Sequence, residues 1–474
     1  MEKIKVGFVP AHREPFDEEW AIQMRKRCLD ALSKVKELEI VVPNEGQTRN
    51  GLVRDDADAG KTIDLFTEEG INGLMIGTMT FGDEVSALSI ASAFSSLPVL
   101  LFGTKEGPFK PDGGRRSDSF CGTLSISSGL VRRKIPFIFM GIVFPEEGIF
   151  LDSIRNFIRV CSIVNGFNGA KIGLVGPRPE RFQTCIFSED AVMKQFEQRV
   201  VPISLLDIVN RINMLKDDAP KVQKAIQEIR EQADLTGLKE ETLTKIAKLE
   251  CVLRNFAEEK ALSGLGVQCW TAMEEVYGIA PCYAMGRLTD RGIMTSCEVD
   301  IYGTLTMLIQ YLASLRTTPP HFIDWTIQHQ EKENVFLSWH CGNAPPSLAC
   351  EGCKVTIKAH SIMDEAKHSI TDEVLGMERT TGTAEFQLKP GDVTLCRLSE
   401  HDGKFKMLIT KGEIMQTDQS LRGSWSWVEV PNLDSLYRTL VEEGFVHHAS
   451  LVHGNYVRTI KDACKFLGIE PIVV

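Results

Sequence analysis

Two groups of acidic residues within residues 269–307 have the type and spacing to do chemistry. One group is Glu274 with Glu275, and the other is Glu298 with Asp300. Apolar residues flank the second group on both sides, so at least one of its carboxylates is expected to face a buried environment. An isolated charge in the interior costs more free energy than folding can offset, so a buried carboxylate needs a cation, a hydrogen-bond donor or a proton.

Helical phase separates the two acids of the first group. In the helix predicted after Leu262, Glu274 shares a face with Trp270 and Tyr277, because side chains three or four positions apart lie on the same side. Glu275 points to the opposite side. We therefore predict that Glu274 is the inward acid, whereas the second group stays undecided on spacing alone.

Histidines near the C-terminal end are candidate partners for these acids. His447, His448 and His453 lie within seven residues, in a chain that has only ten histidines. A set of histidine and carboxylate ligands suits a moderately hard divalent ion such as Mn²⁺ and leaves positions open for substrate oxygens. The alternative is a set of packed histidines unconnected to the acids. His340 ends an apolar run, and it either lines the same cavity or caps a strand.

Composition excludes several classes of protein. The net charge of −11 argues against a general binder of nucleic acid or anionic membranes. No secretory or membrane-spanning apolar stretch is present, so we expect a cytoplasmic protein. Thirteen scattered cysteines favour reduced thiols over a disulfide framework. Cys350 and Cys353 could hold zinc, but without a second such pair we expect two reduced structural thiols.

Three domains are predicted to position these residues. In residues 1–168 short apolar runs alternate with helical patterns, which is typical of a parallel sheet covered by helices on both faces. The pattern restarts in residues 169–302, where 206–262 reads as a pair of long amphipathic helices. Residues 303–474 change to short runs broken by Gly, Pro, Asp and Asn, which predicts antiparallel hairpins. The predicted fold class is α/β, with two Rossmann-like doubly wound domains followed by an antiparallel β-barrel-like domain. The apolar runs of the first domain are 5–9, 38–42, 73–77, 98–103 and 137–141.

Loops after the parallel strands are the expected ligand-binding loops of the first domain. They include Ala11–Glu14 and Thr78–Gly82. Arg13 could reach an anionic or polyhydroxyl substrate through its fork of donors, or it is an ordinary exposed arginine. No dinucleotide or P-loop motif occurs in the right context, so nucleotide binding lacks support.

Several stretches of the chain resemble the L-fucose/L-arabinose isomerase family, in particular its shorter fucose-isomerase-like branch. The likeness covers nearly the whole chain in the same order. The resemblance implies two Rossmann-like domains followed by an antiparallel β domain. The more specific stretches are KIGLVGPRP (171–179), TAMEEVYG (271–278), CEVD (297–300), FIDW (322–325), WHCG (339–342), HHASLVHG (447–454) and FLGI (466–469).

The resemblance also implies a metal site. In this family two carboxylates and one histidine hold a divalent ion, usually Mn²⁺, with Mg²⁺ or Co²⁺ as substitutes, and the carboxylates also move protons. By motif the first acid falls on Glu274, and the histidine falls on His448. The second acid is Glu298, because Cys-Glu-Val-Asp resembles the Gly-Glu-Gly-Asp of the arabinose branch. Asp300 is the alternative, since it lines up with an Asp of the fucose isomerases. A further histidine of the arabinose branch has no counterpart among residues 312–316.

The activity implied by the resemblance is that of an aldose–ketose isomerase, working through an enediolate or a hydride shift. Its substrate is expected to be a hexose, a 6-deoxyhexose or a 6-substituted sugar that could be anionic, for example sulfonated. The expected substrate-binding residues are Arg13, Trp20, Arg287 and His340. Two alternatives stay open: a non-catalytic sugar-binding or regulatory protein, and a metal-dependent aldolase or dehydratase.

Oligomer formation is also implied by the resemblance. Family members form closed trimers or hexamers, in which the N-terminal domain of one subunit approaches the metal site of its neighbour. We therefore expect a homo-oligomer in which Arg13 and Trp20 act in trans on a small-molecule sugar. Neither nucleic acid nor a membrane is expected as a partner.

Overall fold

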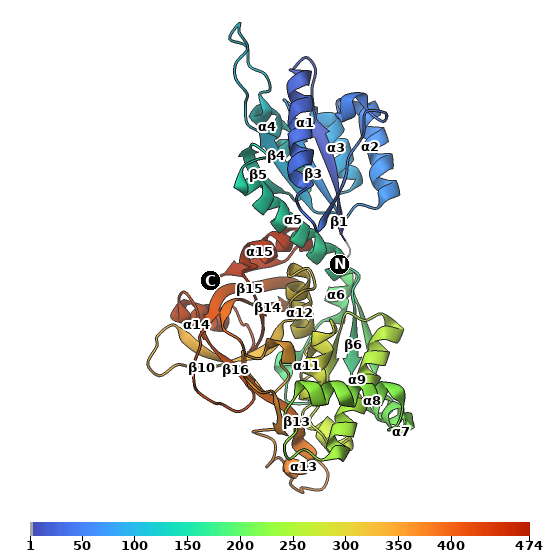
Figure 1. The fold of residues 1–474 in the computed structure, drawn as a ribbon, viewed down its shortest axis with the longest axis vertical. Helices are drawn as coiled ribbons and strands as arrows, with labels where there is room; N and C mark the ends of the chain where they lie inside the picture. The colour runs from blue at the N-terminus through green and yellow to red at the C-terminus, as the bar shows by residue number, and fades with distance from the viewer. Residues whose placement is uncertain (1–2) are drawn as a thin grey trace. The chain divides into compact units, whose positions relative to one another are not determined.

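The computed structural model of the protein describes residues 3–474, which form two compact units (Figure 1). The first unit contains the chain up to Gly166 together with Arg458–Gly468. The second unit contains Phe167–Val457 and Ile469–Val474. Within residues 3–474 no helix is long and apolar enough to cross a membrane.

A five-stranded parallel sheet forms the centre of the first unit, with the strand order β2-β1-β3-β4-β5. All five apolar runs predicted from the sequence are strands, which confirms the Rossmann-like prediction. The strands are β1 (Ile4–Ala11), β2 (Leu38–Val41), β3 (Gly73–Thr78), β4 (Val99–Thr104) and β5 (Ile138–Val143). The helices are α1 (Glu18–Leu32), α2 (Asp56–Glu69), α3 (Glu84–Ala93), α4 (Ser119–Arg132), α5 (Gly148–Phe167) and α15 (Val457–Leu467).

The elements of this unit follow from local sequence. Every residue of β3 and β4 is buried, as expected for central parallel strands covered on both faces. The first three helices each begin after an aspartate whose side chain accepts a hydrogen bond from a backbone N–H of the first turn, namely Asp17, Asp55 and Asp83. Late in the chain α15 returns to this unit, where Thr459 donates a hydrogen bond to Asn156 of α5 at 2.7 Å.

A four-stranded parallel sheet opens the second unit, with the order β7-β6-β8-β9. The predicted pair of long helices over 206–262 is wrong, because the chain forms three helices there. Pro220 occupies the first turn of the second of them, where its missing N–H is tolerated but a continuing helix is not. The strands are β6 (Lys171–Val175), β7 (Arg199–Ile203), β8 (Gly264–Val267) and β9 (Met294–Ser296). The helices are α6 (Glu189–Phe196), α7 (Leu205–Met214), α8 (Pro220–Gln232), α9 (Glu240–Lys260), α10 (Ala272–Val276), α11 (Cys282–Asp290) and α12 (Ile301–Ala313).

A nine-stranded mixed sheet completes the second unit. Six of its strands pair antiparallel in a closed circuit, β16-β11-β10-β17-β14-β15 and back to β16, which matches the antiparallel prediction. Parallel pairings of β13 with β16 and of β15 with β18 make the whole sheet mixed. The strands are β10 (His321–Gln328), β11 (Val335–His340), β12 (Thr356–Ala359), β13 (Thr381–Gln387), β14 (Gly391–His401), β15 (Lys404–Ile414), β16 (Ser424–Glu429), β17 (His448–His453) and β18 (Glu470–Val473). Two helices accompany them, α13 (Gly376–Thr380) and α14 (Leu433–Glu442).

Helix α12 joins the two sheets of the second unit. It contacts β8 and β9 of the parallel sheet and β14 and β17 of the closed circuit. Nearly all of its residues are buried, as expected for a helix that is apolar on every side. The Gln310 side-chain amide donates to the backbone carbonyls of Thr394 and Ser450, at 3.0 Å each. These two bonds hold the C-terminal part of the helix against β14 and β17.

Candidate active site

The starts of α12 and β17 bring an acid and a histidine together. Asp300 caps α12, and its Oδ1 accepts a hydrogen bond from the N–H of Gly303 at 2.8 Å. His448 is the first residue of β17, and the antiparallel register pairs it with Asp324 of β10. Residues that are distant in sequence thus meet because a helix end and a strand ladder converge.

The backbone between β9 and α12 is strained. Glu298 has a φ of +51° and Val299 a φ of +59°, a left-handed conformation that costs non-glycine residues about 1–3 kcal/mol each. Two contacts hold it: the N–H of Val299 donates to the carbonyl of Val267 at 3.2 Å, and the N–H of Glu298 donates to Cys269 Sγ at 3.4 Å. The turn fixes the directions in which Glu298 and Asp300 point.

Asp300 is fully committed within the protein. Its carboxylate forms a buried ion pair with Arg397, and its Oδ2 accepts a hydrogen bond from His448 Nδ1 at 2.9 Å. Burial raises the pKa of Asp300, but the positive charge of Arg397 and the His448 hydrogen bond lower it more, so the net pKa lies below the ordinary value. Asp300 therefore stays charged and keeps Nδ1 of His448 protonated. Nε2 is then the ring nitrogen whose lone pair is free to bind a metal ion.

His448 Nε2 faces two further carboxylates. It lies 3.5 Å from Glu298 Oε2 and 3.7 Å from Asp324 Oδ1. Both oxygens are buried, and neither has a hydrogen-bond partner among residues 3–474. Two carboxylate oxygens and one imidazole nitrogen thus converge with unused bonding capacity.

The electrostatics of this cluster reflect that unused capacity. Burial raises the pKa of Glu298 well above its ordinary value, and Cys269 and Asp324 add to the shift while His448 opposes it. Burial also raises the pKa of Asp324 to about 6, again against the opposing effect of His448. Burial lowers the pKa of His448, but Asp300, Asp324 and Glu298 outweigh it, so the net shift is upward. Glu298 and Asp324 are thus buried beside a histidine whose effect does not offset the cost of burying their charge.

A divalent metal ion fits this donor set. The buried, unpartnered oxygens of Glu298 and Asp324 and the free Nε2 of His448 are the hard and borderline ligands that such ions take in open catalytic sites. Glu298, His340 and His448 also form a group whose ligand atoms lie within 4.8 Å of one another. Glu298, Asp324 and His448 could therefore hold a metal ion, and Asp300, whose carboxylate is already paired with Arg397, lies beside them.

Glu274 is placed at the side of this cluster. It is 1% exposed, which agrees with the prediction of an inward acid. The predicted helix is wrong, because α10 spans only Ala272–Val276 and contains neither Trp270 nor Tyr277. Burial raises its pKa well above the ordinary value, and the charge of Glu298 adds to the shift. Its Oε2 is buried and has no hydrogen-bond partner in the described part of the chain. Glu275 points elsewhere and accepts hydrogen bonds from Thr271 and Ser369.

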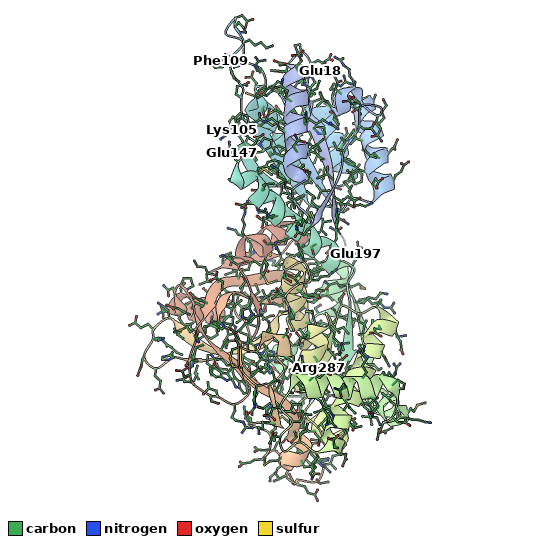
Figure 2. All side chains as sticks on the ribbon, in the orientation of Figure 1. Glu18, Lys105, Phe109, Glu147, Glu197 and Arg287 are labelled. Carbon is green, nitrogen blue, oxygen red and sulfur yellow. A yellow bond between two sulfur atoms is a disulfide. The ribbon has the colours of Figure 1, made fainter. Side chains whose placement is uncertain are left out.

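His340 lies beside the cluster and Arg287 lies elsewhere. His340 is 3% exposed, and its ring is 6.2 Å from that of His448. Arg287, labelled in Figure 2, is buried on α11, where its guanidinium pairs with Glu250 and Glu228. Those carboxylates occupy its donors, and the structure does not bring it to the acid–histidine cluster.

Arg13 and Trp20 lie in the first unit. The Arg13 guanidinium is partly exposed, lies 5.2 Å from the ring centre of Phe81, and pairs with Glu84 at 3.4 Å. The Trp20 side chain is 8% exposed, and its ring packs under Gly107. Arg13 thus keeps an accessible charge at the carboxyl edge of the first sheet.

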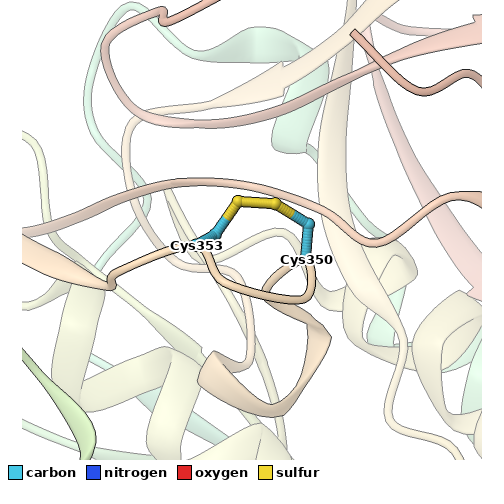
Figure 3. Close-up of a disulfide and its surroundings, with 2 residues drawn as sticks. All are labelled: Cys350 and Cys353. Carbon is cyan, nitrogen blue, oxygen red and sulfur yellow. A yellow bond between two sulfur atoms is a disulfide. The ribbon is translucent and has the colours of Figure 1, made fainter. Parts of the chain in front are cut away.

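The Cys350–Cys353 pair differs from the sequence expectation. The two residues form a disulfide at the turn that precedes β12 (Figure 3), so the prediction of two reduced thiols is wrong in this structure. Their Cα atoms lie 5.1 Å apart, within the range that a disulfide can bridge. The other eleven cysteines form no disulfide within the described residues.

Two members of the cluster were not selected by sequence reasoning. Asp324 lies in the FIDW stretch, but only the pairing of β10 with β17 places it opposite His448. Arg397 lies in the middle of β14 without any local motif, and its role is visible only through its ion pair with Asp300. A buried arginine in a strand requires an acidic partner, which is the one signal that could have pointed to it.

Comparison with known proteins identifies the class to which this fold and site belong. Residues 7–168 match the family described as "Fucose/sulfoquinovose isomerase, N-terminal domain", and residues 338–473 match "L-fucose isomerase, C-terminal domain". The chain belongs to this fucose/sulfoquinovose isomerase family.

Similar proteins share the full length of the chain. Sulfoquinovose isomerases from Priestia aryabhattai and Priestia megaterium are each 26% identical to it over 482 residues, with 100% of both chains covered. A sulfoquinovose isomerase from Alkalicoccus urumqiensis is 25% identical over 407 residues, covering 85% of this chain and 86% of its own.

Proposed function

We propose that the protein is an aldose–ketose isomerase that interconverts a 6-sulfonated aldose of the sulfoquinovose type with its 2-ketose. The observation that carries the proposal is the convergence of Glu298 Oε2, Asp324 Oδ1 and His448 Nε2, all buried and with unused bonding capacity. The names of the two full-length relatives support the sulfonated substrate.

Proton transfer is the task of the buried carboxylic acids. Isomerisation removes a proton from C2 of the open-chain aldose and delivers one to C1. Burial raises the pKa of Glu274 and of Glu298, so each carboxylate has the increased proton affinity that a group needs to take a proton from carbon and return it. Two such acids with unpartnered oxygens provide an acid and a base for the two carbon atoms.

His448 and Asp300 prepare the site. Asp300 keeps the Nδ1 of His448 protonated, so His448 offers Nε2 to a ligand and does not act as the base. We propose that Glu298, Asp324 and His448 hold Mn²⁺, which when bound acts as a Lewis acid toward the sugar hydroxyl and carbonyl oxygens. His340, buried with its ring 6.2 Å from that of His448, shields one side of the cluster from water.

The sulfonate requires a cation that the cluster itself does not offer. Arg397 is paired with Asp300, Arg287 with Glu250, and Arg178 donates to backbone carbonyls of its own loop. Arg13 is exposed and weakly paired. We therefore propose a homo-oligomer, a trimer or hexamer, in which Arg13 of one subunit binds the sulfonate held in another.

A cytoplasmic setting is also proposed, since eleven of the thirteen cysteines form no disulfide among the described residues.

Trp20 supports the proposed role of Arg13 in the neighbouring subunit's site. Its ring packs against the loop at Gly107 and fixes the start of α1, which is close in sequence to Arg13.

The test is a product assay in D₂O. Purified protein with Mn²⁺ is incubated with sulfoquinovose, with glucose, with L-fucose and with glucose 6-phosphate, and followed by proton NMR. We expect a ketose isomer of sulfoquinovose with solvent deuterium at C1, and much slower conversion of the others. Cleavage or loss of water would indicate an aldolase or a dehydratase. Binding of the sugar without conversion would indicate a non-catalytic protein, and either result would refute the proposal.

A further inference from the structure

A second cluster of potential metal ligands lies behind the acid–histidine cluster and consists of sulfur. Cys282 is the first residue of α11, Cys297 follows β9, and Cys341 follows β11, which ends at His340. All three thiols are buried. Three separate elements of the second unit thus deliver cysteines to one place, which random packing of scattered cysteines does not require.

The distances within this cluster approach those of a metal site. Cys282 Sγ lies 3.3 Å from Cys341 Sγ. His340 Nδ1 lies 3.0 Å from Cys341 Sγ and 4.0 Å from Cys297 Sγ. In a tetrahedral zinc site two thiolates lie about 3.8 Å apart, and a thiolate and an imidazole nitrogen about 3.6 Å apart. Shifts of less than about 1 Å would bring the observed separations to those values.

The surroundings suit thiolate ligands. The Asn343 side-chain amide donates to Cys297 Sγ at 3.4 Å, as an outer partner of a charged sulfur would. Cys282 occupies the start of α11, where the helix dipole favours negative charge. The group of Cys297, His340 and Cys341 has ligand atoms that all lie within 4.8 Å of one another.

We propose that Cys282, Cys297 and Cys341, with His340 Nδ1 as the fourth donor, form a thiolate site for Zn²⁺. This site is distinct from the oxygen-rich set around His448. Thiolates select zinc-like ions and bind Mn²⁺ poorly, whereas carboxylates accept Mn²⁺, so the two sites sort ions by ligand softness. His340 also belongs to the group with Glu298 and His448. An ion at the thiolate site would therefore fix the His340 ring beside the acid–histidine cluster.

Cadmium titration tests the site because Cd²⁺ imitates Zn²⁺ and reports thiolate ligation directly. The full-length Cys350→Ser/Cys353→Ser variant, in which this pair cannot bind the ion, is reduced, kept in excess Mn²⁺ to fill oxygen-rich sites, and titrated with Cd²⁺ while ultraviolet absorbance and ¹¹³Cd NMR are followed. We expect one Cd²⁺ per chain, a thiolate-to-metal charge-transfer band, and a chemical shift typical of sulfur-rich ligation. Zn²⁺ should compete for the same site, but because thiolates favour the softer Cd²⁺, only a large excess of Zn²⁺ should reduce the band.

Single substitutions identify the ligands. Cys282→Ser and Cys341→Ser should each lower the affinity for Cd²⁺ at least tenfold and reduce the band, while Cys251→Ser, a buried thiol of α9 outside the cluster, should leave both unchanged. Circular dichroism and thermal unfolding confirm that each variant is folded, and Cys297→Ala replaces any that is not. An unchanged band in the cluster variants, or Cd²⁺ bound through oxygen alone, would overturn the proposal.

Discussion

Replacing Asp300 with asparagine tests the buried ion pair on which the site depends. Asp300 and Arg397 are each 1% exposed, and asparagine keeps the shape and one acceptor oxygen but removes the charge. Breaking a buried pair by neutralising one partner costs about 3–5 kcal/mol, because the other charge is left uncompensated. Since asparagine still accepts hydrogen bonds, we expect the lower end of this range, which lowers the Tm by roughly 6–12 °C.

Equilibrium unfolding in urea measures this loss, and its pH dependence tests the cause. Because the pKa of Asp300 is lowered in the folded state, its contribution is complete above the unfolded value of about 4 and is lost as pH falls toward the folded value. The stability difference between the wild type and Asp300→Asn should therefore shrink below about pH 4. Because Asp300 also raises the pKa of His448 in the folded state, the difference should be largest near about pH 5 and decline again as pH rises above about 6.5, the unfolded value of histidine.

Asp434→Asn provides the matched control. Asp434 pairs with Arg438 one turn later on α14, but both side chains are exposed, so the loss should be at most about 0.5 kcal/mol. If the free energy of unfolding of Asp300→Asn lies within about 1 kcal/mol of the wild-type value, the Asp300–Arg397 pair does not fix His448. The orientation of Nε2 toward a metal ion would then need another explanation.

Three further predictions follow from the acids and from Arg13. Glu274→Gln should lower kcat about 10²–10⁴-fold and abolish deuterium exchange while Mn²⁺ binding, measured calorimetrically, persists; retained exchange would remove Glu274 from the mechanism. Burial raises the pKa of Glu298 and of Asp324, the latter to about 6, so the folded state is more stable when these acids are protonated. The Tm of protein freed of metal by a chelator should therefore fall as pH rises from 5 to 8, and added Mn²⁺ should raise the Tm by a larger amount at higher pH. A Tm that does not depend on Mn²⁺ would contradict the metal site. Arg13→Ala should raise KM for sulfoquinovose about 10–100-fold and leave that for neutral sugars unchanged, with Arg115→Ala, in an exposed loop of the same unit, as the control; equal effects on both sugars would exclude a sulfonate contact.

Local sequence predicts those parts of the fold that depend on short-range patterns. The five strands of the first unit were recognised because central parallel strands are apolar on both faces. Glu274 is buried as predicted, but the predicted reason does not hold, because Trp270 and Tyr277 lie outside α10. The sequence predicts two helices over 206–262 where the structure has three, because the amphipathic pattern continues across the break before Pro220.

Long-range pairing limits what the sequence alone reveals. Asp324 and His448 meet because β10 pairs with β17 in one particular register, and no local pattern encodes that register. The partners of Arg397 and Arg287 are likewise distant in sequence. The sequence predicts that Arg287 binds the sugar, but in the structure the carboxylates of Glu250 and Glu228 pair with its guanidinium group. Charged residues can be assigned to a site only when their competing partners are known.

The strained turn at Glu298 and Val299 has a consequence for how this protein could change over evolutionary time. Glycine at position 299 would relieve about 1–3 kcal/mol of backbone strain and lose about 1.5–3 kcal/mol from the buried valine side chain, so the two effects nearly cancel. Purifying selection for stability alone would then not resist that substitution. A lineage released from selection for catalysis could acquire it at no cost to folding, and would keep both units while the Glu298 carboxylate lost its fixed direction.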